Sequence, residues 1–262
     1  MTTQTTISLF LVTCLAALMA SVQTPSGAKA APAKPTEGVV HYERRTFWPR
    51  IYARMTYLSQ EQKDRISNLT RNFTENKEKM KLTFSKSQSL YAYANESAEY
   101  EGSSYKGRNG DLFFFRDFDK ERILDVEETL GRTYVIEDSL RLPAWRISDQ
   151  IKEIAGHLCS KATTTDPLKN QSITAWFAQD IHVPAGPERF YGLPGLILEL
   201  DINDGDVVIE ATSVVIKATA NELKPPKSKG KRVTSAAFDK LLRDHIATST
   251  KAQQNPYWGI RY

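Results

Sequence analysis

The dipeptide Asp204-Gly205 constrains this chain most, because it stands between two runs of apolar and β-branched residues in the stretch from Leu196 to Ile216. A two-residue type I′ turn needs positive φ angles at both central positions, and Asp-Gly supplies them. The turn sets a register that pairs Ile202 with Val207, Leu200 with Ile209, Leu198 with Ala211 and, on the other face, Glu199 with Glu210. Apolar side chains from both strands then share one face, so the stretch predicts an antiparallel hairpin. The glutamate pair is mildly unfavourable unless a cation lies between the two side chains, and the sequence does not explain it.

Short strand-like runs continue this pattern along the chain. From Lys79 to Phe84, lysine or threonine alternates with apolar residues, which is the period of a strand with one solvent-facing and one buried side. Further runs are Val39–Arg44, Leu90–Ala94, Leu112–Phe118, Ile123–Glu127 and Arg132–Asp138, with turn residues at Asn109-Gly110 and Gly131. No helical crossover separates these runs, which favours antiparallel pairing.

Two segments carry helix signals. Ser59 and Gln62 have the spacing of a capping box, and a stripe of Ile66, Leu69 and Phe73 follows them. Near the other end, Thr234 or Ser235 can cap a helix near 234–247. Its apolar side is expected to hold Phe238, Leu241, Leu242 and His245 or Ile246.

These elements together predict a mainly β fold with minor α content, in the α+β class. We expect a curved antiparallel sheet or half-barrel of short strands, covered by one or two helices.

The first segment predicts export. Ile7 to Ala20 is an apolar run too short to span a bilayer comfortably, and small and polar residues follow it, as in a signal peptide. Cleavage is expected after Ala30, with Ala20 and Ala28 as alternative ends. The expected organisation is a signal peptide at 1–30, a flexible leader at 31–37 and a single β-rich domain at 38–262, without a transmembrane segment in the mature chain. We expect the protein in the periplasm or in the envelope, associated with the outer membrane.

Charge and cysteine content narrow the classes of partner. The 35 basic and 31 acidic residues leave a formal net charge of +4 and are mixed along the chain, which does not indicate nucleic acid binding. The one basic run, Lys224 to Arg232, is interpreted as a solvated linker, with contact to anionic lipid head groups as the alternative. After signal cleavage Cys159 is the only cysteine left, so no intramolecular disulfide can form.

Cys159 could serve as a nucleophile or as a buried structural residue. His157 lies two residues away, and a neighbouring imidazole can lower a thiol pKa, but no third positioning group is visible in the sequence. We therefore expect a buried structural cysteine and no catalytic residue. His41, His182 and His245 lack metal-ligand spacing, so no metal site and no cofactor are expected.

Several short motifs follow one another between Trp145 and Leu200. Besides the hexapeptide Gly192-Leu193-Pro194-Gly195-Leu196-Ile197, the chain carries Trp145-x-Ile147, Lys152-x-Ile154-x-Gly156, Cys159-x-Lys161-Ala162, Ala175-Trp176-Phe177 and Gly186-Pro187. In this order and spacing the stretch resembles the GLPGLI family of exported bacterial proteins. The resemblance implies export, a β-rich domain and no established activity that could be carried over.

The hexapeptide itself is interpreted as structural. Pro194 restricts φ at one turn position and Gly195 tolerates the positive φ of a type II turn at the next, so a turn is expected to lead into the strand at Leu196. The motif has no titratable group, nucleophile or metal ligand, which favours a role in folding.

Three hypotheses for function follow. The first is a non-enzymatic periplasmic or surface binding module for a hydrophobic small molecule. Its motivation is a set of large apolar residues that could line a cavity: Phe113, Phe114, Phe115, Trp145 and Trp176. The second is an accessory partner of an outer-membrane transporter or secretion complex, in which the same residues form a contact patch. The third is an enzyme that uses Cys159 and His157.

Overall fold

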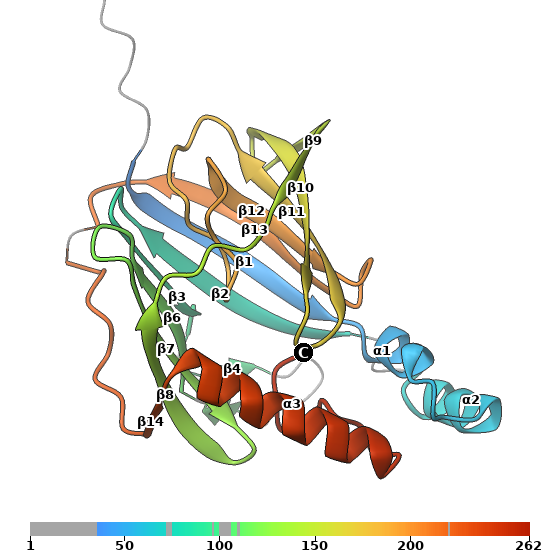
Figure 1. The fold of residues 1–262 in the computed structure, drawn as a ribbon. Helices are drawn as coiled ribbons and strands as arrows, with labels where there is room; N and C mark the ends of the chain where they lie inside the picture. The colour runs from blue at the N-terminus through green and yellow to red at the C-terminus, as the bar shows by residue number, and fades with distance from the viewer. Residues whose placement is uncertain (1–35, 72–74, 96, 100–105, 109–110, 220) are drawn as a thin grey trace, which may run out of the picture. The chain divides into compact units, whose positions relative to one another are not determined.

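The computed structural model of the protein describes residues 36–71, 75–95, 97–99, 106–108, 111–219 and 221–262, and these residues form a mainly β structure with three helices (Figure 1). The expectations for the signal peptide, the leader up to residue 35, Phe73 and the Asn109-Gly110 turn lie outside the described residues. Twelve strands form one open sheet in the order β14-β8-β7-β6-β3-β2-β1-β13-β12-β11-β10-β9. The predicted fold class is therefore confirmed.

The strands of the large sheet are β1 (Gly38–Thr46), β2 (Asn76–Phe84), β3 (Gln88–Tyr93), β6 (Leu112–Asp117), β7 (Arg122–Thr129), β8 (Arg132–Ser139), β9 (Arg146–Ile154), β10 (His157–Asp166), β11 (Gln171–Ala178), β12 (Leu196–Ile202), β13 (Val207–Ile216) and β14 (Lys231–Val233). Two further strands, β4 (Ser97–Glu99) and β5 (Lys106–Arg108), pair only with each other. All neighbouring pairs in the large sheet are antiparallel except β14 and β8, which run parallel. The end of the predicted basic linker is thus a strand, which sequence composition alone did not indicate.

The predicted hairpin joins β12 to β13. Ile202 pairs with Val207 and Leu200 with Ile209, as expected. Asn203, Asp204 and Gly205 all have positive φ, and the N–H of Asp206 donates to the carbonyl of Ile202 at 3.0 Å, so the connection is a four-residue turn and the expected two-residue type I′ turn is wrong. The ladder between these two strands keeps the expected register but ends at Glu199 and Glu210, so the expected pairing of Leu198 with Ala211 is not part of it. On the other edge of β13, Ala211 lies opposite Tyr42 of β1, next to a bulge. Each glutamate has a cation of its own, at 2.6 Å from Lys152 to Glu199 and 2.8 Å from Arg45 to Glu210.

The connection between β8 and β9 requires the sheet to curve. β8 stands second and β9 last in the strand order, so ten steps of about 4.8 Å, roughly 48 Å, would separate them in a flat sheet. The chain has only residues 140–145 between the two strands, and seven extended Cα steps reach at most about 25 Å. This segment, called the strap below, crosses in front of the inner face of the curved sheet (Figure 1). Trp145 Nε1 donates to the carbonyl of Tyr191 at 2.9 Å and so ties the strap down.

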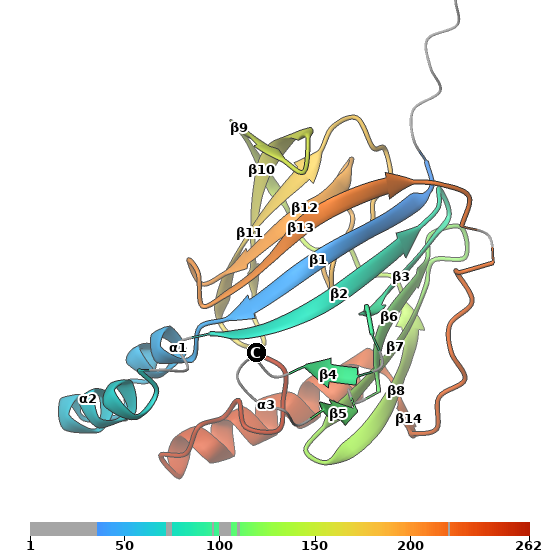
Figure 2. The ribbon, with the colours of Figure 1, turned by 180° about the vertical axis from the view of Figure 1, so that it is seen from behind.

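Three helices accompany the sheet. α1 (Trp48–Arg54) has Pro49 in its first turn and buries only Ile51, and α2 (Gln60–Leu69) begins with the predicted capping box of Ser59 and Gln62. The two helices follow β1 and lie beyond the end of β1 and β2 (Figure 2). The stripe expected on α2 is not buried, since Leu69 is 76% exposed. α3 (Ser235–Lys251) is capped by Thr234, and its Phe238 packs edge-on against Tyr134 of β8.

The two faces of the sheet bury different residues. The inner face carries the main core, which includes Val40, Leu82 and Leu200. The outer face carries a small apolar cluster of Phe113, Val126 and Val135, and Pro225 and Pro226 lie against it. The inner face is the one that α3 and the strap cover (Figure 1).

Candidate functional site

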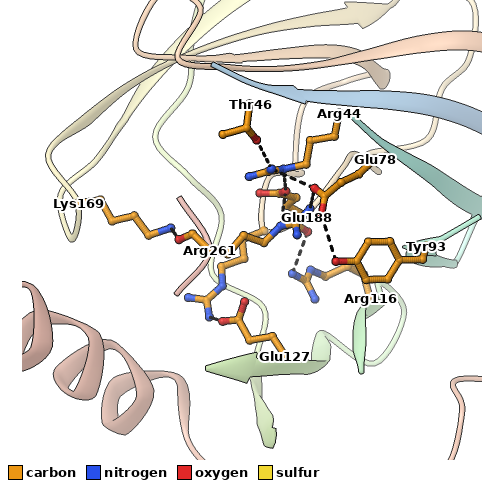
Figure 3. A network of polar contacts seen from close by, with 10 residues as sticks. Arg44, Thr46, Glu78, Tyr93, Arg116, Glu127, Lys169, Glu188 and Arg261 are labelled. Atoms are coloured by element: carbon orange, nitrogen blue, oxygen red, sulfur yellow. Dashed lines mark hydrogen bonds and ion pairs between the residues drawn. The ribbon is translucent and has the colours of Figure 1, made fainter. Parts of the chain in front are cut away.

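A group of four paired charges lies on the inner face at one end of β1 and β2. It consists of Arg44, Glu78, Glu188 and Arg261, called the charged cluster below (Figure 3). Glu188 Oε1 accepts from Arg44 Nε at 2.9 Å and from Arg261 Nε at 2.7 Å. Glu78 Oε2 accepts from Arg44 Nη1 at 3.0 Å and from Arg261 Nη2 at 3.4 Å. Two cations and two anions therefore balance one another where little water reaches them.

The strand pattern explains how β1 and β2 supply half of the cluster. Alternate residues Val40, Tyr42 and Arg44 of β1 face inward, and Arg44 lies opposite Glu78 of β2. Arg44 and Glu78 thus occupy neighbouring inward positions. At the other inward positions of these two strands the side chains are mostly apolar. Tyr93 of β3 donates to Glu78 at 3.2 Å and extends the cluster by one strand.

The other two members arrive from outside the sheet. Glu188 belongs to the buried segment between β11 and β12, and its backbone has φ +54, a left-handed value that is uncommon for a residue with a side chain. Arg261 belongs to the segment that follows α3 and is half-buried between the buried residues Ile260 and Tyr262. Both residues are held in position by tertiary contacts and not by a regular element.

The cluster keeps its carboxylates ionised. Burial opposes ionisation of Glu188, but Arg261 and Arg44 outweigh burial and lower the pKa to about 2. The pKa of Glu78 is lowered in the same way, with burial opposed by Arg261 and Arg44. Both groups are therefore anions throughout the neutral range.

A second group of charges continues along the inner face. Arg189 donates to Glu127 at 2.8 Å and approaches Asp239 of α3 at 3.4 Å. Arg116 pairs with Asp125 in a fully buried contact, where burial raises the pKa of Asp125 although Arg116 acts against it. The charges of this face are thus mostly engaged with each other.

A cavity of about 560 Å³ opens beside these charges. The strap, α3, the β10–β11 turn and the segment around Glu188 all contribute to its walls. Its apolar lining includes Phe114, Leu142, Pro143, Leu168, Phe190 and Leu242. Its charged lining includes Glu127, Lys169, Glu188, Arg189, Asp239 and Arg261. A volume of this size and a mixed lining are typical of small-molecule sites.

A smaller hollow of about 360 Å³ lies on the other side of the C-terminal segment. Arg44, Glu78 and Tyr93 line it, and it shares Glu127, Arg261 and Tyr262 with the larger cavity. Arg261 and Tyr262 therefore stand between the two spaces. Tyr262 is held there by its hydroxyl group, which donates to Asp206 at 2.6 Å.

The structure does not bring the predicted Cys and His candidates together. Cys159 is completely buried, and its thiol contacts the backbone carbonyl of His157 and not the imidazole. Burial, with a smaller contribution from Asp180, raises the pKa of Cys159 to about 12. The His157 ring instead meets Asp180 at 2.8 Å. A thiol in this environment is not an activated nucleophile.

The aromatic residues expected to line one cavity are distributed over the two faces. Phe114 lines the inner cavity and Phe113 lines a separate hollow under Pro225 and Pro226. Trp145 anchors the strap, and Trp176 lies under the ammonium group of Lys152 at 4.4 Å. The histidines His41, His182 and His245 belong to different regions, and the described part of the chain holds no group of three or more metal-ligating side chains.

The hexapeptide motif is tightly packed, but the backbone conformation at Gly195 differs from the expected one. Gly192 has φ +90, whereas Gly195 does not have the positive φ expected of it, so the type II turn prediction at that residue is wrong. Gly195 is instead constrained by close approach, because a Cβ there would lie 1.9 Å from the carbonyl oxygen of Ala178. Leu193, Leu196 and Ile197 are buried in the core, while Pro194 is exposed.

Sequence reasoning missed the charged cluster. The available signal was local: Arg44 continues the inward series of Val40 and Tyr42, and Glu78 begins the inward series of Met80 and Leu82. A charge at an inward position of a strand indicates a buried partner. Glu188 and Arg261 have no such pattern around them.

Comparisons with known proteins give a family match and a fold. A family model described as a protein of unknown function (Porph_ging) matches residues 168–199, a stretch that contains Lys169, Glu188, Arg189 and the hexapeptide. A search of curated proteins returns no match.

Among solved structures, the chain is similar to PNGF-II in the P21 space group (TM-score 0.51, 14% identity) and to PNGF-II in the C2 space group (TM-score 0.50, 14% identity). The matches cover 79% and 78% of this chain but 33% and 32% of those chains, so the chain spans about a third of their length. At this identity the similarity extends to the fold alone.

Proposed function

We propose that the protein is a non-enzymatic binding module that holds a small molecule with an apolar body in the cavity under the strap. The observation that carries the proposal is the cavity of about 560 Å³, whose walls combine apolar side chains with fixed charges. Segments far apart in the sequence build these walls, so the space depends on the complete fold. Pockets of this size with few, well-placed polar groups favour specific binding of one small molecule.

The chemistry of the lining supports binding over catalysis. A general acid or base works best with a pKa near the working pH, and Glu188 has a pKa of about 2. Glu127 and Asp239 share Arg189, which holds them in place as partners. The only thiol in the described residues, Cys159, is buried and has a raised pKa. These groups are suited to fixing the shape and charge of a site.

Export to the periplasm or to the outer-membrane-associated envelope is part of the proposal. Its support is the apolar run Ile7 to Ala20 followed by small residues. Within the described residues, no helix is both long enough and apolar enough to cross a membrane.

A second candidate function is an accessory partner of an outer-membrane transporter or secretion complex. The edge of the sheet favours it, because Ile147 and Ile151 of β9 and Leu158 of β10 are all more than half exposed. An edge strand with exposed apolar side chains can pair with another chain. Photo-crosslinking from position 151 in intact cells would capture such a partner, and an absence of crosslinked species would count against this candidate.

Native mass spectrometry of the protein purified from its own host tests the binding module. We expect wild type to carry a bound small molecule, and Leu168→Trp, which fills the cavity, to lose it. Leu158→Trp is the matched control, since Leu158 is an exposed residue of β10 outside the cavity. A ligand-free wild type, or equal occupancy in both variants, would contradict the proposal.

A further inference from the structure

The cavity is lined by both apolar and polar side chains, and this mixture limits the class of ligand that can bind there. The strap and α3 contribute the apolar side chains of Leu142, Pro143 and Leu242. The β10–β11 turn, the start of β11 and the C-terminal segment contribute the polar side chains of Lys169, Gln171 and Arg261. An apolar molecule alone would leave these polar groups without partners.

The ammonium group of Lys169 has N–H donors that no described residue uses. Its ammonium group donates to the backbone carbonyl of Arg261 at 2.8 Å (Figure 3), and among the described residues no carboxylate oxygen forms an ion pair with it. An ammonium group has three N–H donors, so two are left for a ligand. Lys169 is partly buried, which strengthens any charge-assisted hydrogen bond that it makes.

Gln171, the first residue of β11, adds a second donor next to this turn. Its side chain is 2% exposed and lines the cavity, yet its Nε2 has no hydrogen-bond partner in the described part of the chain. Buried amide groups in folded proteins nearly always have partners. A buried, unpartnered donor in a cavity wall indicates that an acceptor belongs there.

The carboxylates of the cavity do not compete for these donors. Glu188 is occupied by Arg44 and Arg261, and Glu127 and Asp239 by Arg189. Asp166 accepts from the backbone N–H groups of Leu168 and Lys169. Two further cations, Arg141 and Arg243, stand at the exposed rim. With Lys169, Arg189 and Arg261, the lining carries five cations against the four carboxylates named above, a net charge of +1 that favours an anion next to the unused donors of Lys169 and Gln171.

The direction of the pKa shift of Lys169 is consistent with an anion site. Burial and then Arg189 lower the pKa of Lys169, and Glu127, Asp166 and Glu188 compensate only in part. A bound anion would supply the missing stabilisation of the charged form.

We propose that the cavity binds an amphipathic anion, with a carboxylate or phosphate group held by Lys169 Nζ and Gln171 Nε2 and an apolar chain lying against Leu142, Pro143 and Leu242. The inference rests on the proposed function and names its ligand class. The shared chemistry is one anionic group on an apolar chain.

Calorimetric titration with three probes of equal chain length tests the inference: dodecanoate, dodecyl phosphate and dodecanol. We expect one of the two anions to bind wild type at least about tenfold more tightly than the alcohol, as a charge-assisted hydrogen bond to a partly buried site requires. The comparison of the two anions tells a carboxylate ligand from a phosphate ligand. If alcohol and anions bind equally well, the inference is overturned while the binding module stands, and if none of the probes binds, this ligand class is excluded.

Two variants locate the effect. Lys169→Met should reduce the preference for the anion to within about twofold while dodecanol binds as before, because only the charged contact is lost. Lys161→Met is the control, since Lys161 is on the neighbouring strand β10 and contacts Trp176 outside the cavity. An unchanged preference in Lys169→Met, with the fold verified by an unaltered circular dichroism spectrum, would overturn the assignment to Lys169.

Discussion

Two regions of the inner face are buried alike but held together in different ways. Around Leu82, Leu200 and Ile202 the face is apolar, and neighbouring strands contribute interchangeable contacts. Two and three strands from Leu200 in the same cross-strand row, Arg44 and Glu78 require Glu188 and Arg261, which come from two distant segments. The apolar region is stabilised by the area it removes from water, whereas the charged region depends on each partner being present. One face of a sheet can thus combine an apolar core, which tolerates substitution by other apolar residues, with a charged region, in which each residue needs its partner.

The charged cluster lies beside the cavity, which Ile202 of the apolar region also lines. Replacing a buried ion pair by apolar residues is often neutral or stabilising, so such pairs are weak evidence for stability in themselves. Here the pairing fixes Glu188 and Arg261 at the wall of the cavity. We interpret the charged cluster as a device that holds the site in shape.

The largest expected effect comes from Glu188→Gln. The change removes one of the two anions that Arg44 and Arg261 share and leaves them with Glu78 alone, and we expect a loss of about 3–5 kcal/mol in the free energy of unfolding at pH 7. The folded-state pKa of about 2 lies below the ordinary 4.5, so this stabilisation is present above pH 4.5 and is lost as pH falls toward 2. Chemical denaturation of both proteins between pH 7 and 3 measures it.

The control for this change is Glu61→Gln, which removes an exposed ion pair with Arg65 on α2. Exposed pairs of this kind contribute little, so the variant should unfold like wild type at every pH. If wild type and Glu188→Gln have the same free energy of unfolding at pH 7, the claim that the charged region depends on each partner is wrong.

Leu200→Ala examines the apolar region in the same assay. Leu200 is fully buried between Ala175 and Ile209 of the adjacent strands, and its truncation should cost about 3 kcal/mol. Because no charge is involved, the loss should be the same at pH 7 and at pH 4. A loss that changes with pH would show that the two regions are coupled.

Gly195→Ala should cost about 2 kcal/mol, since a Cβ would meet the backbone oxygen of Ala178 and separate two segments that border the apolar region. Gly131→Ala is the comparison: Gly131 has φ +71 but nothing within 4 Å of its Cβ position, so only the conformational cost of about 1 kcal/mol remains. Thermal unfolding of the two variants separates close approach from backbone strain. A Gly195→Ala variant more stable than Gly131→Ala would refute the packing account of the hexapeptide.

The smallest effect is expected from Cys159→Ala, with a loss of about 1 kcal/mol for the void left by the sulfur. Maleimide should label the native thiol slowly and the denatured thiol fast, because burial holds the pKa of Cys159 at about 12. Rapid labelling of the native protein at pH 6 would indicate an activated thiolate and would restore the enzyme hypothesis.

The parts of the fold that were predictable from the sequence are those with local signals. Asp204-Gly205 specifies a turn through its backbone, and Ser59 and Thr234 begin helices by capping them. β14 was missed because its residues read as a basic loop, and only the parallel contact of Lys231 to Val233 with β8 makes it a strand. α1 was missed because it is short and owes its position to the single buried residue Ile51.

The candidate site was largely unpredictable for a related reason. Arg44 and Glu78 could have been recognised from strand alternation, but their partner Glu188 is 144 residues from Arg44 along the chain. Lys169 and Gln171 can be recognised as site residues only from the cavity that the strap and α3 help to enclose. Pairings across such separations depend on the curvature of the sheet, which no local pattern encodes.

The central claim is that the inner face keeps a fixed set of ionised side chains next to an open cavity. The most direct test is an NMR titration of the protein with ¹³C-labelled glutamate side chains, in which the resonance missing from Glu188→Gln identifies Glu188. The account predicts that this carboxyl group remains ionised down to a pKa of about 2. Titration of Glu188 near the ordinary value of 4.5 would contradict it, because the group would then lack the stabilising contacts with Arg44 and Arg261.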